Sequence, residues 1–136
     1  MSRYRLEVKS RYLIMLSNDD LHYPTVVVAH NDAELRSTLA DRLRQDGYNV
    51  LEADDLPSMV EIVLTQTRPL HLLTDPSTDT RTWAKRLKHH RPEMIVWFVD
   101  RPHLELPSDV LTPEIALTTV RGFLNRFRGE ASAGQM

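Results

Sequence analysis

The residue best placed to do chemistry in this sequence is Asp75, which directly follows the apolar run Leu70–Thr74. A buried strand that ends in an acidic residue presents a carboxylate at the carboxyl edge of a sheet, where α/β proteins gather their ligands. A second polar group, His30–Asp32, follows another apolar run, Thr25–Ala29. A carboxylate in this position could act as a nucleophile or hold a cation, and its neighbours decide which of these it does.

Composition excludes several kinds of site. The 136 residues contain no cysteine, so disulfides, thiolate metal sites and thiol nucleophiles are excluded. The 4 glycines are not spaced as GxGxxG or GxxxxGK[ST], which excludes the usual dinucleotide-binding and P-loop motifs. The protein has a net charge of −2, whereas nucleic-acid binders are typically strongly positive. We therefore expect no nucleic-acid partner.

The hydrophobic fraction of 41% and charged fraction of 26% are typical of one globular domain. The longest apolar run, Met94–Val99, is far shorter than the roughly 20 residues that cross a bilayer. The first residues also lack the uninterrupted apolar stretch of a signal peptide. We therefore expect a cytoplasmic protein that does not bind membranes.

Apolar runs alternate with segments of helical periodicity, which predicts strand–helix units and a parallel sheet. The expected strands are Thr25–Ala29, Asn49–Ala53, Leu70–Thr74 and Met94–Val99, and the expected helices run from Asn31 to Gly47, over Pro57–Thr67 and over Arg81–His90. The fold class is therefore α/β: a small doubly wound, flavodoxin-like and mostly parallel sheet with helices on both faces.

Three helix starts are predicted from capping residues. Asn31 with Glu34 three positions later forms a capping box. Asp55 is the expected cap of the second helix. Pro76–Thr80 is interpreted as a polar loop before the third helix begins at Arg81.

The order of these elements and the residues at their ends resemble the receiver domain of two-component response regulators, over about residues 25–127. The resemblance rests on Val26–Arg36, which looks like the first strand, acidic turn and helix start of a receiver. It also rests on Pro69 followed six residues later by Asp75, and on Leu104–Pro107, which is similar to the Lys-Pro motif of the last strand. The resemblance implies a role in two-component signalling or a phosphorelay.

Carried onto this sequence, the resemblance makes Asp75 the phosphate acceptor. In receivers an acidic pair after the first strand holds Mg²⁺, a hydroxyl residue ends the fourth strand, and a lysine ends the fifth. Here His30 and Asn31 replace the acidic pair, Val99 the hydroxyl residue and Leu106 the lysine. Because Mg²⁺ prefers carboxylate oxygens, we expect no metal ion, no cofactor and a pocket that has lost its phosphate switch.

Two residues beside Asp75 leave alternatives open. Asp32 could replace the missing Mg²⁺ ligands after a register change, or it could cap the following helix. His30 could form a charge-assisted hydrogen bond or ion pair with Asp75, or lie solvated at the edge of a loop. The pair His89-His90 is interpreted as a helix end, where cations favour the dipole, rather than as a metal site.

The chain after Val99 is too short for the fourth helix of the receiver plan. Only Asp100–Pro102 separates the fourth strand from the candidate fifth strand, His103–Leu106, whereas a parallel crossover takes about a dozen residues. We therefore expect a sheet truncated after its fourth strand, with His103–Leu106 either irregular or an antiparallel edge strand. Thr112-Pro113 is the expected start of the last helix.

Loss of that helix is expected to leave one face of the fourth strand uncovered. A contiguous apolar patch usually marks a partner surface. The expected interaction surface consists of Ile95, Trp97, Val99, His103 and Leu104. A second copy of the chain, another protein or the N-terminal extension could cover it, and a homodimer is the expected form.

The chain is expected to have three segments. Residues 1–22 form an N-terminal extension, a strand or β-hairpin, residues 23–128 the receiver-like domain, and residues 129–136 a flexible tail. The four basic residues of the extension are interpreted as a solvated polar edge rather than a contact for an acidic partner or nucleic acid.

Four functions are compatible with these residues. The first is a non-catalytic pseudo-receiver that binds protein partners, itself included, without phosphorylation, and we favour it. The second is a phosphorylatable receiver with a rearranged acceptor site at Asp75. The third is a phosphatase with an aspartyl-phosphate intermediate; haloacid-dehalogenase-like enzymes place an acidic residue where this chain has Ser77. The fourth is a small-ligand sensor.

Overall fold

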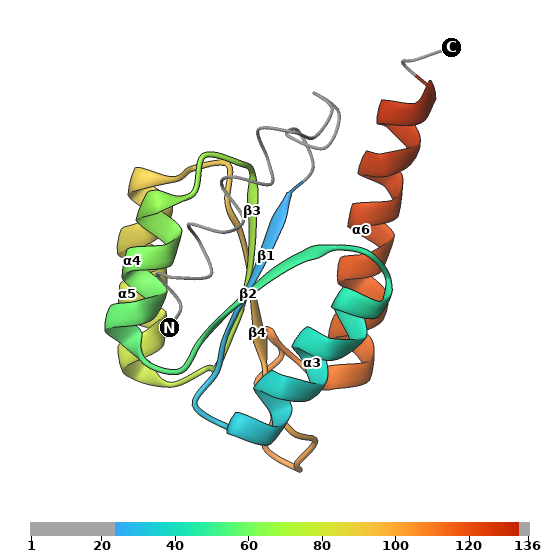
Figure 1. The fold of residues 1–136 in the computed structure, drawn as a ribbon. Helices are drawn as coiled ribbons and strands as arrows, with labels where there is room; N and C mark the ends of the chain where they lie inside the picture. Colours follow the sequence, from blue (N-terminus) through green and yellow to red (C-terminus); the bar gives the residue numbers. More distant parts are fainter. Residues whose placement is uncertain (1–23, 134–136) are drawn as a thin grey trace.

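The computed structural model describes residues 24–133, with side chains as far as residue 126. The strand or hairpin expected over residues 1–22 lies outside the described residues. The described elements are β1 (Thr25–Ala29), α3 (Ala33–Gln45), β2 (Asn49–Ala53), α4 (Leu56–Thr65), β3 (Leu70–Thr74), α5 (Thr78–His90), β4 (Ile95–Val99), β5 (Val110–Leu111) and α6 (Pro113–Ala133) (Figure 1).

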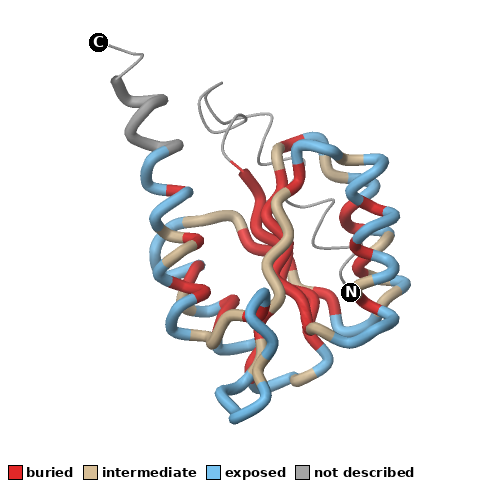
Figure 2. Tube along the Cα trace, turned by 180° about the vertical axis from the view of Figure 1, so that it is seen from behind, coloured by how far each residue is buried: buried red, intermediate tan, exposed pale blue. Residues whose placement is uncertain are grey.

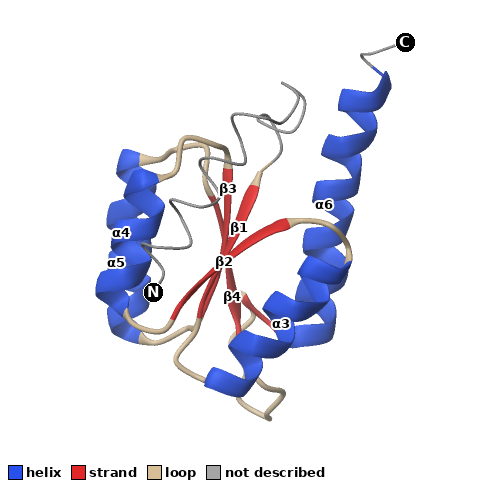
Figure 3. Ribbon diagram, viewed as in Figure 1, coloured by secondary structure: helices blue, strands red, loops and turns tan. Residues whose placement is uncertain are grey.

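The strands form one sheet in the order β2-β1-β3-β4-β5, and all four neighbouring pairs are parallel. Helices α3 and α6 cover one face of the sheet, and α4 and α5 cover the other (Figures 1 and 3). This arrangement confirms the predicted doubly wound, flavodoxin-like α/β fold. The order changes direction between β1 and β3, so their carboxyl ends border the crevice where such folds bind ligands.

Each face of the sheet has its own apolar cluster. The cluster under α3 and α6 includes Val26, Leu39, Leu43, Leu73 and Val120, all with no exposed surface. The cluster under α4 and α5 includes Val27, Met59, Ile62, Leu72 and Met94, each 2% exposed or less. Because the parallel strands are buried on both faces, they consist of apolar residues almost throughout.

Two helices begin at residues other than the predicted ones. The cap of α3 is Asp32, whose side chain accepts a hydrogen bond from the Leu35 backbone N–H, so the assignment of Asn31 was wrong. Helix α5 begins at Thr78, three residues before the predicted start, because the Ser77 hydroxyl accepts from the Thr80 backbone N–H. The predicted loop Pro76–Thr80 therefore contains the first turn of this helix.

The fifth strand also differs from the prediction. His103–Leu106 is irregular, which was one of the two predicted alternatives. The predicted truncation of the sheet after its fourth strand was wrong, because Val110–Leu111 forms a fifth strand that pairs with β4 in parallel. Its connection from β4, residues 100–109, carries no helix, which confirms the predicted loss of the fourth helix of the receiver plan. The connection can be short because β5 has only two residues and pairs only with the end of β4.

Two of the predicted surface residues of β4, Val99 and Trp97, lie against the core instead. Val99 has no exposed surface and belongs to the cluster under α6, and Trp97 packs against the same cluster. Ile95, on the same side of the strand, is only partly buried and stays a predicted surface residue. On the opposite side, Val96 and Phe98 are partly buried against the other cluster. The Arg81 guanidinium lies over the Phe98 ring, 4.4 Å from its centroid.

The last helix is longer than predicted. Helix α6 runs to Ala133, whereas the predicted flexible tail began at residue 129. Residues 134–136 lie outside the described residues. Over the described part of the chain, none of the helices combines the length and apolar character needed to cross a membrane.

Candidate functional site

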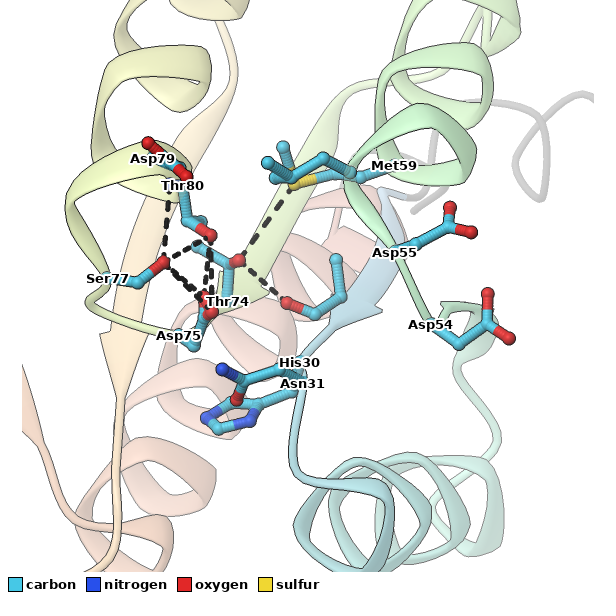
Figure 4. Close-up of a pocket in the computed structure, with 12 residues that line it drawn as sticks. His30, Asn31, Asp54, Asp55, Met59, Thr74, Asp75, Ser77, Asp79 and Thr80 are labelled. Carbon is cyan, nitrogen blue, oxygen red and sulfur yellow. Dashed lines mark hydrogen bonds between the residues drawn. The ribbon is translucent and has the colours of Figure 1, made fainter.

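A pocket of about 250 Å³ lies at the carboxyl ends of β1 and β3, beside Asp75 (Figure 4). The turns after β1, β2 and β3 and the first turns of α4 and α5 form its walls. Its polar lining residues are His30, Asn31, Asp54, Asp55, Thr74, Asp75, Ser77, Asp79 and Thr80. The predicted grouping of Asp75 with His30 and Asn31 at one edge of the sheet therefore matches their positions in this pocket.

Asp75 is only 5% exposed, and hydroxyl groups of α5 occupy both of its carboxylate oxygens. The Thr80 hydroxyl donates at 2.6 Å to Oδ1 and lies 3.1 Å from Oδ2. The Ser77 hydroxyl lies 3.2 Å and 3.4 Å from the same oxygens. Thr80 is itself buried. The carboxylate is therefore held within the start of α5, which gives it a structural role independent of any reaction.

His30 is neither paired with Asp75 nor solvated. It is 3% exposed, and its Nε2 lies 2.7 Å from the backbone carbonyl oxygen of Val99. The backbone N–H of Asp32 donates to Nδ1 at 3.1 Å. Because Nδ1 accepts this bond, the ring proton sits on Nε2 and is donated to Val99. His30 thus links the turn after β1 to the end of β4, and both interpretations made from the sequence were wrong.

Asp32 is held away from the role of a metal ligand. Its carboxylate caps α3 and also accepts from Arg101, whose Nε lies at 2.6 Å and Nη2 at 3.2 Å. The hydrogen bond from Arg101, together with that from the Leu35 backbone, holds the pKa of Asp32 well below its usual range. Asp32 does not line the pocket beside Asp75. The helix-capping alternative is therefore the one that the contacts support.

The other two receiver positions also differ from a phosphate-binding set. The side chain of Val99 is apolar and buried, and its backbone carbonyl oxygen is hydrogen-bonded to His30. Leu106 lies in the connection before β5, so its assignment to the lysine position was wrong. Thr112 and Pro113 are the residues that follow β5. The residue that lies between the end of β5 and Pro113 is Thr112, whose side chain carries no positive charge.

Sequence reasoning missed three acidic residues of the pocket. Asp54 and Asp55 follow β2, and Asp79 lies in the first turn of α5. The position of Asp54 and Asp55 directly after a predicted strand was a usable signal, as it was for Asp75. Over residues 24–126, no three Asp, Glu, His or Cys side chains are grouped closely enough to hold a metal ion.

The predicted surface residues beyond β4 lie in the exposed connection. Leu104 is fully exposed, and the His103 ring lies 3.5 Å from a carboxylate oxygen of Asp100. Two arginine pairs tie this connection to the rest of the domain, since Arg101 binds Asp32 and Arg81 binds Asp109 at 2.6 Å. His103 and Leu104 are thus available to a partner, whereas Val99 is not.

No protein-family model and no curated protein sequence matches this chain. Several solved structures share its fold, among them two receiver domains. The receiver domain of the hybrid histidine kinase CckA is 24% identical, with a TM-score of 0.56 over 76% of this chain and 97% of that one. A CheY-like response regulator receiver domain protein from Methanospirillum hungatei JF-1 is 14% identical, with a TM-score of 0.55 over 79% and 99%. The chain therefore has the fold of a receiver domain.

Proposed function

We propose that this protein is a pseudo-receiver: a signalling module that binds protein partners without being phosphorylated and that catalyses no reaction of its own. The observation that carries the proposal is the state of Asp75. Its carboxylate is buried and hydrogen-bonded to Thr80 and Ser77. Hydrogen bonds from two hydroxyl groups, together with burial, make such a carboxylate a weaker and less accessible nucleophile toward a phosphoryl group.

The residues around Asp75 support the same proposal. Phosphoryl transfer depends on a cation that neutralises the charge of the transferring group. The positions that would supply Mg²⁺ ligands hold His30, whose ring nitrogens are both occupied, and the neutral amide of Asn31. Thr112, between β5 and Pro113, offers a new phosphate no ammonium partner. A phosphate on Asp75 would therefore lack the contacts that stabilise it and transmit its presence.

A phosphorylatable receiver with a rearranged site is the second candidate. The observation that favours it is the pocket of about 250 Å³ next to Asp75, which is large enough to admit a phosphoryl group. Asp54 and Asp79 on its walls are exposed carboxylates that could attract a cation. The pseudo-receiver and the phosphorylatable receiver differ in whether Asp75 accepts a phosphoryl group.

The test is incubation with Mg²⁺ and acetyl phosphate, followed by intact mass measurement and acid-quenched peptide mapping. We expect no mass increase at Asp75 and no stabilisation by beryllofluoride, with Asp75→Asn as the background control. A phosphoryl or beryllofluoride adduct at Asp75 would overturn the proposal. As a positive comparison, Asn31→Asp with Thr112→Lys returns an acid and an ammonium group, and we expect any reactivity to be greater in this double variant.

A further inference from the structure

The outer edge of β4 is covered by β5 along only part of its length. Strand β5 pairs with Phe98 and Val99 at the carboxyl end of β4. Over the described residues 24–133, no strand lies beside residues 95–97 on this side of the sheet. The amino half of β4 therefore has an open side, which we refer to as the β4 edge.

The backbone groups of Val96 face the β4 edge. The Asp100 backbone N–H donates to the carbonyl oxygen of Leu111 in β5 at 3.0 Å, so Asp100 faces the side on which β5 lies. Every second residue of a strand directs its N–H and C=O to the same side. Val96 is four residues before Asp100, and its donor and acceptor therefore point to the same side. Backbone groups on an open strand edge are a template for a further strand.

The burial of β4 also differs from that of the inner strands. Every residue of β1 and β3 is buried, and each of these strands has a neighbour on both sides. The first four residues of β4 are apolar but only partly buried, although helices cover both faces of the sheet. A strand added at the β4 edge would increase the burial of these side chains, which favours its binding.

The opposite edge of the sheet, formed by β2, is protected in a different way. The apolar residues of β2 are buried, and its partly exposed Glu52 pairs with Arg44 of α3 at 2.7 Å. Charged side chains on an edge strand are a common protection against further pairing. Strand β4 contains no charged residue. Of the two edges, the β4 edge is thus the one that favours an added strand.

We propose that residues 12–16 of the same chain, Tyr12-Leu13-Ile14-Met15-Leu16, bind the β4 edge as an antiparallel strand. These residues lie outside the described part of the chain. The chain that follows them must reach the amino end of β1 at Thr25. A strand beside β4 that leads to this end of the sheet runs opposite to β4, because β1 and β4 are both parallel to β3.

The composition of residues 12–16 matches the place between the two helix layers. A strand covered on both faces consists of apolar residues almost throughout, and all five residues of this run are apolar or aromatic. The earlier stretch, residues 4–8, alternates instead and would place Arg5 and Glu7 against one of the layers. The run at residues 12–16 is therefore the better match to the β4 edge.

The connection to β1 is long enough for the segment to bind its own domain. An added strand would lie three strand spacings from β1, about 14 Å, because β3 and β4 come between them. Residues 17–24 form the connection, and these eight residues can span up to about 26 Å. Binding therefore requires no segment from a second copy of the chain.

The test is amide hydrogen exchange and nuclear Overhauser contacts, measured by NMR on the full chain. In the parent we expect contacts between the backbone of residues 12–16 and Val96, and an amide of Val96 that exchanges at least about a hundredfold more slowly than an exposed amide. The double variant Leu13→Pro with Ile14→Pro removes two neighbouring amide donors, one of which faces β4 in either register. Exchange at Val96 should become at least about tenfold faster in this variant.

The matched control is Leu6→Pro with Glu7→Pro, which places two prolines in the earlier stretch and should leave Val96 protected. The Asp100 amide, which is bonded to Leu111, should be unchanged in both variants and reports whether the domain stays folded. The parent contacts decide the matter if a variant unfolds.

Three results would each overturn the proposal. One is a Val96 amide in the parent that exchanges as fast as an exposed amide. Another is equal protection of Val96 in the two double variants. The third is protection that disappears on dilution, because this would identify a second copy of the chain as the occupant. An Asp75 adduct in the phosphodonor experiment would leave all of these measurements unaffected.

Discussion

At the level of single residues, the carboxylate of Asp75 is a part of the fold. Its two oxygens accept from Thr80 and Ser77, and the Thr80 hydroxyl is buried. Removing the carboxylate leaves a buried hydroxyl without its strongest acceptor, and an unsatisfied buried donor costs about 1 to 3 kcal/mol. A catalytic carboxylate usually behaves in the opposite way: replacing it with a neutral residue raises the stability of the protein, because active sites are often strained.

We therefore expect Asp75→Ala to lower the free energy of unfolding by about 1 to 3 kcal/mol, measured by urea denaturation. Asp75→Asn keeps one carbonyl acceptor and should lose less. Asp54→Asn, an exposed residue of the same pocket, is the control and should stay within about 0.5 kcal/mol of the parent. A gain of stability in Asp75→Asn would identify a strained active-site carboxylate and contradict the structural role.

His71 gives the protein a dependence on pH that is separate from the pocket. It is 5% exposed, accepts from the Trp97 indole N–H at 3.1 Å, and lies against Phe123 of α6. Burial lowers its pKa from 6.5 to about 4. The unfolded chain therefore binds a proton near pH 6.5, whereas the folded chain resists it until about pH 4.

Because the pKa of His71 is lower in the folded than in the unfolded chain, the free energy of unfolding is highest above pH 6.5 and falls as the pH drops from 6.5 to 4. The loss over this window is roughly 3 kcal/mol. We expect the free energy of unfolding to fall over that window in the parent chain. His71→Phe should flatten the slope, while His89→Gln, an exposed histidine of α5, serves as the control. An unchanged slope in His71→Phe would show that other groups set the acid dependence.

At the level of elements, the start of α5 depends on one hydroxyl. Ser77 caps the helix and also contacts Asp75, so it fixes the strand end and the helix start together. We expect Ser77→Ala to cost about 1 kcal/mol of stability, as the loss of an N-cap usually does. Thr78→Ala, at the exposed neighbouring position, is the matched control for denaturation. Equal losses in the two variants would show that the cap contributes nothing beyond helix propensity.

Element order was predictable from the sequence because long apolar runs and helical periodicity are strong local signals. The bounds of β1, β2 and β3 agree with the predicted strands. The start of α5 was missed because Ser77 and Asp79 are as common in loops as in a first helical turn. The two-residue strand β5 was missed because Val110–Leu111 is too short to show any periodicity, and its parallel pairing depends on the path of the preceding connection.

The candidate site was predictable in its location but not in its contacts. Strand ends placed Asp75, His30 and Asn31 at one edge of the sheet, because parallel strands bring their carboxyl ends together. The bond from His30 to the Val99 carbonyl joins residues 69 positions apart, and no local pattern encodes it. Likewise, Asn31 and Asp32 are equivalent cap candidates in sequence, and the pairing of Asp32 with Arg101 distinguishes them only in three dimensions.

At the level of the whole molecule, one sheet separates two apolar clusters, and the chain's two tryptophans report on different sides of it. Trp97 lies on the side of α3 and α6, and Trp83 lies on α5. Because both clusters share the strands, we expect them to unfold in one cooperative transition. Figure 2 shows the buried strands that the two layers of helices share.

This cooperativity is measurable with single-tryptophan variants. Trp83→Phe and Trp97→Phe each leave one fluorescent probe, and their denaturation curves should coincide with far-ultraviolet circular dichroism of the same variant. Adding Leu39→Ala, a cavity under α3, should shift both probes equally and cost about 2 to 5 kcal/mol. A transition seen by Trp97 at lower denaturant than that seen by circular dichroism would show that the α6 side opens on its own.

The hydroxyl contacts of Asp75 bear on what an aspartate at this position means. Once a carboxylate anchors the start of a helix, its loss lowers stability whether or not it takes part in a reaction. The folding of α5 is therefore a sufficient reason for an aspartate at this position, and the residue type alone is no sign of phosphoryl transfer.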